Sequence, residues 1–66
     1  MLKINVSKMA VAMVNAGIST SHELAEKSGV SVNTISRLRN GGKAKLPTLK
    51  KLAVTLGINP SDLIDA

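Results

Sequence analysis

The residues best equipped for chemistry lie in one stretch, GVSVNTISRLRNGGKAKLP, which covers residues 29–47. On a helix with about 100° per residue, Ile35 and Leu38 define a buried side. The polar residues within about 50° of the opposite pole are Asn33, Ser36, Arg37 and Asn40. An asparagine can hydrogen-bond an adenine edge and an arginine a guanine edge, each through two bonds. This face therefore has the chemistry to read base pairs of duplex DNA.

The start of the same helix carries two further candidates. Ser31 is placed to cap the helix, and the free N–H groups of a capped end favour a nearby phosphate. Val32 lies in the first turn and has no obvious core to enter. Together with the polar face, these residues indicate a helix whose exposed side serves binding.

The charge of the chain points to the same kind of partner. The net charge is +5, and residues 27–61 contain seven basic residues and no acidic one. Such a block on a small domain suits a polyanion. The chain has no Phe, Tyr or Trp, whereas single strands and RNA loops are usually held by stacking on aromatic rings. We therefore expect duplex DNA as the partner.

Other function classes lack their residues. There is no cysteine, and His22 as the single histidine is too few for a zinc site. No nucleophile–base set is visible, and GGKAK lacks the spacing of a nucleotide-binding loop. We expect no catalytic or metal-binding residue, no cofactor and no enzyme activity. Without a membrane span or a signal peptide, a soluble cytoplasmic protein is expected.

Capping and stop signals divide the chain into elements. Residues 2–6 alternate apolar and polar side chains and predict an extended arm. Five short helices follow: one capped by Asn5, with Met9, Ala10, Met13 and Val14 as its apolar stripe and Gly17 as its stop; one from about Ser21 to Ser28, with Thr20 and Glu23 as a capping box; one from Ser31 to Asn40; one from Pro47–Thr48 to Gly57; and one capped by Asn59. This predicts an all-α fold in one domain of residues 1–66.

The spacing between the second and third helices is specific. The pattern Leu-Ala-x₃-Gly-Val-x₄-Ile-x₂-Leu begins at Leu24 and predicts a helix-turn-helix over about residues 21–40. The segment ELAEKSGVSVNTISRLRNG resembles the helix-turn-helix of the Cro and C1 repressor family, also called the XRE family. PTLKKLAVTLGINPSDLI is similar to the fourth and fifth helices of that family, so the resemblance covers nearly the whole chain and implies a lambda-repressor-like DNA-binding domain.

The resemblance also implies roles for individual residues. Helix three would lie in the major groove of operator DNA. By position, the base-reading residues would be Val32, Asn33, Ser36 and Arg37, and the residues that meet phosphate or an edge base would be Ser21, Ser31, Asn40, Lys43 and Lys45. At the first turn of such a helix, Val32 would rest on a thymine methyl. The chain departs from the family at Ser21, where Gln is common, at Arg39, where many members carry Glu, and in a turn at residues 17–20 that is one residue longer.

We therefore expect a repressor-like, sequence-specific DNA-binding transcriptional regulator, of phage or bacterial type, that blocks its operator sterically. Dimers would be weak and would form through helices four and five, through the arm, or only on DNA. An alternative is a protein-interaction module, such as an antitoxin or an anti-repressor, although interface cores are usually depleted in lysine. The chain fits either an intact small regulator or the N-terminal domain of a longer one.

Overall fold

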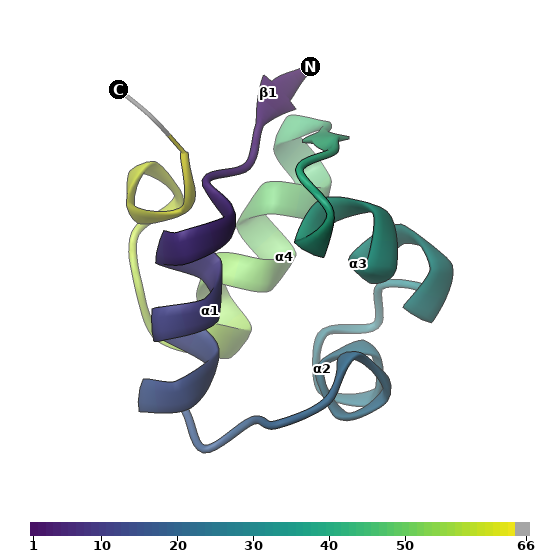
Figure 1. Cartoon of the computed structure of the whole chain (residues 1–66), viewed down its shortest axis with the longest axis vertical. Coiled ribbons are helices and arrows are strands. Elements are labelled where there is room, and N and C mark those ends of the chain that lie inside the picture. Colours follow the sequence, from purple (N-terminus) through teal and green to yellow (C-terminus); the bar gives the residue numbers. More distant parts are fainter. Residues whose placement is uncertain (65–66) are drawn as a thin grey trace.

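The computed structural model describes residues 1–64, in which four α-helices, one 3-10 turn and two short strands follow one another (Figure 1). In chain order they are β1 (Leu2–Lys3), α1 (Val6–Asn15), α2 (Ser21–Ser28), α3 (Val32–Arg39), β2 (Lys43–Ala44), α4 (Leu46–Leu56) and the 3-10 turn η1 (Pro60–Leu63). Figure 1 shows the strand pair at one end of the molecule and α2 at the other. The predicted all-α class is confirmed, with a small strand pair added to it.

Side-chain caps set the starts of α2 and α3. At α2, Thr20 Oγ1 accepts a hydrogen bond from the Glu23 N–H at 3.1 Å. The Glu23 carboxylate reaches one residue further back than predicted, because its Oε1 accepts from the Ser19 N–H at 3.1 Å. At α3, Ser31 Oγ accepts from the Thr34 N–H at 3.3 Å. These bonds satisfy backbone donors that have no partner inside the helix.

The first helix confirms Met9 and Met13 of its predicted apolar stripe, but it buries Ala12 and not Ala10 or Val14. Met9, Ala12 and Met13 are buried, whereas Ala10 is exposed and Val14 is 75% exposed. The sequence VSKMAVAMVN is apolar on nearly every side. Periodicity alone therefore could not select the buried stripe, and packing against the other helices did.

The predicted fifth α-helix is wrong, since residues 60–63 form a 3-10 turn of four residues. The Asn59 N–H donates to Asp62 Oδ2 at 3.2 Å, as a helix start requires. The chain then becomes extended, because Ile64 forms an antiparallel bridge with Ile4 and the Asn5 N–H donates to the Leu63 carbonyl at 2.8 Å. These contacts with the N-terminal arm end the turn before an α-helix can propagate.

The loop after α3 contains a strand that the sequence analysis did not predict. Lys43–Ala44 pairs antiparallel with the arm, so that Leu2 lies opposite Ala44 and Lys3 opposite Lys43. At the start of this return, the Gly42 N–H donates to the Arg37 carbonyl at 2.9 Å. Glycine suits this close approach, because a Cβ atom at position 42 would lie only 2.8 Å from the same oxygen.

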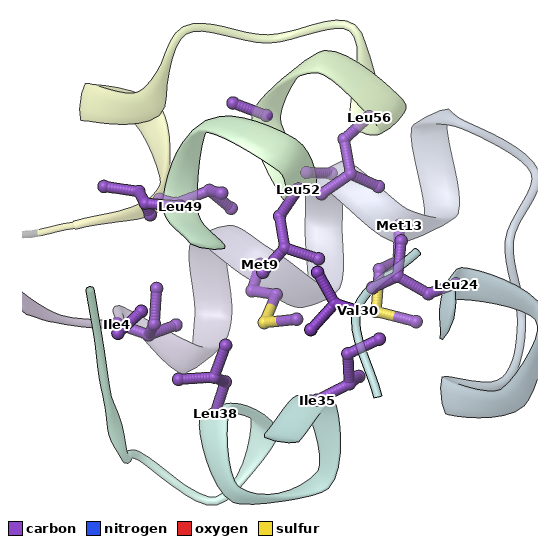
Figure 2. Packing of buried hydrophobic residues seen from close by; sticks show 14 of the residues in the cluster. Ile4, Met9, Met13, Leu24, Val30, Ile35, Leu38, Leu49, Leu52 and Leu56 are labelled. Carbon is purple, nitrogen blue, oxygen red and sulfur yellow. The ribbon is translucent and has the colours of Figure 1, made fainter. Parts of the chain in front are cut away.

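The core contains only aliphatic and methionine side chains, which come from every element except β1 and from the residues between the elements. The largest fully buried side chains are Ile4, Met9, Leu24, Ile35, Leu38, Leu49, Leu52 and Leu63. Figure 2 shows Ile35 and Leu38 pointing from α3 into this cluster, with Val30 beside them. The inner side of α3 therefore packs against α1 and α2, and its other side faces solvent.

Candidate nucleic-acid interface

The outer side of α3 is exposed as predicted. Val32 is 39% exposed, and the side chains of Asn33, Ser36 and Arg37 are exposed as well. Two residues on the opposite side, Ile35 and Leu38, are at most 1% exposed. The structure thus brings all four predicted base-reading residues together on one solvent-facing surface, which we call the α3 face.

The turn before α3 fixes this helix against α2. Gly29 adopts the left-handed conformation, with φ 75°, and its N–H donates to the Ala25 carbonyl at 2.9 Å. Ser28 Oγ donates to the Leu24 carbonyl at 2.7 Å and accepts from the Val30 N–H at 3.2 Å. Because every residue of this turn is bonded or buried, the angle between the two helices is set before any ligand binds.

The cap of α3 shows what Ser31 can offer. Besides its bond to the Thr34 N–H, the Ser31 hydroxyl lies 2.8 Å from the Thr34 hydroxyl. The oxygen of Ser31 is thus engaged inside the protein, and Thr34 is only partly buried beside it. A phosphate at this end would meet the free N–H groups of the first turn and the one hydroxyl hydrogen that the pair of Ser31 and Thr34 leaves free.

On one side of α3 the predicted phosphate-contacting lysines meet Arg37. Lys43 in β2 and Lys45 before α4 are both exposed. A hollow of about 220 Å³ is lined by Met1, Thr34, Arg37, Leu38, Lys43, Ala44, Lys45 and Thr48. None of these residues is acidic, so three cations from α3, β2 and the start of α4 share one hollow. We call it the lysine hollow, and its charge suits a phosphate.

On the other side of α3 lies a second hollow, of about 260 Å³, lined by Ser21, Ser36, Arg39 and Asn40. Asn40 is exposed, but its Nδ2 donates to the Ser36 carbonyl at 2.9 Å, so its donor group is engaged within the helix. Ser21 is partly buried, and its Oγ accepts from Arg39 Nη1 at 2.8 Å. The structure therefore places three predicted contact residues, Ser21, Ser36 and Asn40, together beside Arg39.

Two further cations, Arg39 and Lys3, lie beside the predicted contact residues. In the sequence, Arg39 carried a signal, as a departure from the family that the chain resembles. Lys3 carried none, because only the strand pairing places it directly opposite Lys43. Like charges in that position are unfavourable for the strand pair, and they add positive charge beside the lysine hollow.

Other charged groups pair locally and away from the α3 face. His22 and Glu26 form an exposed pair on α2, with 3.1 Å between His22 Nε2 and Glu26 Oε1. Lys27 Nζ lies 4.0 Å from Glu23 Oε2. Within residues 1–64 no group of three or more His, Cys, Asp or Glu side chains could hold a metal ion, and no helix there is long and apolar enough to cross a membrane.

The fold and this surface define a helix-turn-helix domain of the class that binds DNA. A family model described as the Cro/C1-type HTH DNA-binding domain matches residues 8–66, and the chain belongs to this family. The antitoxin HigA-1 of Vibrio cholerae serotype O1 (strain ATCC 39315 / El Tor Inaba N16961) is 51% identical over 41 residues, or 62% of this chain. The matched segment spans only 39% of that relative's length. No solved structure matches the chain.

Proposed function

We propose that this chain is a sequence-specific regulator of transcription that binds double-stranded operator DNA with α3 in the major groove. The observation that carries the proposal is the α3 face: four side chains suited to base edges and methyl groups project from a helix that the core holds on its other side. An α-helix fits the major groove, where all four base pairs can be told apart. We infer a binding role and not a catalytic one, since the family description names DNA binding.

The roles of the single residues follow from their chemistry. Arg37 would bond a guanine, Asn33 an adenine, and Val32 would contact a thymine methyl, with Ser36 beside them. Lys43 and Lys45 would hold a phosphate of the backbone, with Ser21, Ser31 and Asn40 at further phosphates or at the edge of the site. The lysines supply affinity that depends on salt, and the α3 face supplies specificity.

Repression would follow from occupation of the operator in the cytoplasm, where the bound domain excludes other proteins from the same DNA. We propose that two copies bind a two-fold symmetric site, with half-sites about one helical turn apart. The exposed apolar residues on α4 and the arm include Val54, at 82%, and Met1, at 77%. These are scattered side chains, whereas stable interfaces bury about 1,200–2,000 Å². We therefore infer that the dimer is weak and forms on DNA.

Selection of bound sequences from random duplex DNA tests the proposal. We expect enrichment of a two-fold symmetric sequence, and affinity for it that falls steeply with salt because several cations replace counterions. A slope of log affinity against log salt near zero would contradict DNA binding altogether. Binding with a steep slope but without enrichment would retain DNA binding and remove sequence specificity.

A second candidate function is a protein-interaction module of the antitoxin or anti-repressor kind. The similarity to the antitoxin HigA-1 favours it. It competes with the first proposal only weakly, because the matched segment includes less than half of that protein. If the selection enriches no sequence and duplex DNA does not bind, this candidate takes precedence.

A further inference from the structure

Arg39 lies where three helices meet, and the α3 face makes no use of it. It is the last residue of α3, and its Nη1 donates to the hydroxyl of Ser21, the first residue of α2, at 2.8 Å. It also lines a more apolar hollow that includes Met13 and Val14 of α1. An arginine suits this junction because its methylene stem can lie on apolar surface while the guanidinium remains in water.

The charge of Arg39 is not compensated within the described chain. The ion pairs of residues 1–64 join His22 to Glu26 and Lys27 to Glu23, and Arg39 takes part in neither. The guanidinium also lies beside the first turn of α2, where the helix dipole makes a cation unfavourable. The exposed guanidinium therefore has no carboxylate partner in residues 1–64 and is available to attract an anion from another molecule.

The hydrogen bond between the two side chains leaves only donors facing outward. Because Ser21 Oγ accepts from Arg39, the hydroxyl hydrogen of Ser21 is free to donate to a third group. The guanidinium has five N–H groups, and its bond to Ser21 uses an N–H of Nη1. Phosphate oxygens are acceptors without hydrogens, and the planar guanidinium fits them through two parallel bonds.

The position of Arg39 and Ser21 relative to α3 indicates which phosphate they could bind. The lysine hollow is lined by Thr34, Arg37 and Leu38 of α3. The Arg39 hollow is lined by Ser36 and Arg39 together with Asn40 just after the helix. At about 100° per residue these two sets lie on opposite flanks of the helix. A helix in the major groove lies between two phosphate backbones, and α3 carries a cationic hollow on each flank.

We propose that Arg39 and Ser21 form a binding site for one phosphodiester of duplex DNA, on the strand opposite to the one held by the lysine hollow. The inference rests on the proposed function, because it requires α3 to lie in the major groove. In the free protein Arg39 donates to Ser21. On DNA the remaining guanidinium N–H groups and the Ser21 hydroxyl donate to the same phosphate, so the free chain already holds the donors in place.

Binding of an operator duplex and of an unrelated duplex, measured over a range of salt concentrations, tests Arg39. For Arg39→Gln we expect about fivefold weaker binding to both duplexes at 0.15 M salt, and a salt slope smaller by about one. Arg39→Lys keeps the charge and should keep the slope. Lys8→Gln is the matched control, because it removes the same charge at a site where Lys8 Nζ donates to the carbonyl of Ile64, the residue after η1, at 3.2 Å. Figure 1 shows η1 and α2 on opposite sides of the molecule. The salt slope of Lys8→Gln should change less.

A scan with methylphosphonate, which removes the charge of one phosphate at a time, identifies the contact. When the contacted phosphate is replaced, the affinity of the wild-type chain for the duplex should fall about fivefold. The affinity of Arg39→Gln should not fall further at that position. In Ser21→Ala, the loss of affinity on replacement of that same phosphate should be smaller than in the wild type, and the losses at all other phosphates should be unchanged. Thermal unfolding shows whether each variant is folded. If Arg39→Gln does not fold, the methylphosphonate scan of Ser21→Ala tests the inference.

Three results would overturn the inference. These are an unchanged salt slope in Arg39→Gln, a loss of affinity in Arg39→Gln for the operator duplex alone, and equal losses of affinity in the wild type and Arg39→Gln at every methylphosphonate position. Failure of the proposed function gives a different pattern. If no sequence is preferred but Arg39→Gln still lowers the slope, the phosphate site stands and the sequence-specific function falls. If wild-type protein binds no duplex, both fall together.

Discussion

At the scale of the residue, Arg37 lies between the α3 face and the lysine hollow. It belongs to the α3 face and also lines the lysine hollow with Lys43 and Lys45. If it reads a base, Arg37→Ala should lower the ratio of specific to nonspecific affinity by about 1–3 kcal/mol. Lys45→Ala is the control and should weaken all sequences alike. Uniform loss in Arg37→Ala would make it a phosphate contact, and competition binding with operator and random duplexes separates the two outcomes.

Val32 makes a prediction about the operator itself. Its side chain is 39% exposed at the start of α3 and has no role in the core. If it contacts a thymine methyl, replacing that thymine by deoxyuridine should cost about 0.8 kcal/mol, or roughly fourfold in affinity. The same replacement should cost nothing in Val32→Ala. A scan of deoxyuridine across the operator measures this, and equal losses in both proteins would exclude the contact.

At the scale of the element, the strand pair places two like charges opposite each other. Lys3 lies directly opposite Lys43, and like charges there destabilise a ladder by about 0.2–1 kcal/mol. Lys3→Gln should therefore raise the free energy of unfolding slightly while it weakens DNA binding. Chemical denaturation and binding to the same duplex measure the two effects. A variant that is less stable, or that binds DNA as well as wild type, would speak against this role.

A second prediction at this scale concerns Gly42, which lies between α3 and β2. In Gly42→Ala the new Cβ atom would meet the Arg37 carbonyl oxygen at 2.8 Å, so β2 has to shift and Lys43 with it. We expect loss of both stability and DNA affinity. Gly57→Ala is the control: with φ +71° and no atom within 4 Å, it should cost about 1–2 kcal/mol of stability and leave the affinity of the folded protein unchanged. Thermal unfolding and duplex binding of both variants decide the point, and unchanged affinity in Gly42→Ala would separate β2 from the site.

At the scale of the whole molecule, positive charge opposes association of free chains. The net charge is +5. The exposed apolar side chains with the largest exposed fractions lie apart in the chain, since Val54 is on α4, Val14 is on α1 and Met1 comes before β1. Sedimentation without DNA should therefore show one species of about 6.9 kDa at micromolar concentration. Addition of a two-fold symmetric duplex should give two chains per duplex. A stable dimer without DNA would show that an interface exists in the free protein.

The elements whose signals lie within a few residues were determined by the sequence alone. The caps Thr20 and Ser31 and the turn at Gly29 place α2 and α3 where the sequence predicts them, because each signal acts over three or four residues. The buried side of α3 follows from its own periodicity, and the exposed set of base-reading candidates follows from that. Charge and the lack of aromatic residues identified duplex DNA as the expected partner.

Only the tertiary structure decided the contacts between distant segments. The pairing of the arm with Lys43–Ala44, the 3-10 turn in place of a fifth α-helix, and the choice of the buried stripe of α1 all depend on which surfaces meet in the core. The bond of Arg39 to Ser21 joins residues 18 positions apart. Local propensity carries no information about such pairs, because their energy arises only after the helices have packed.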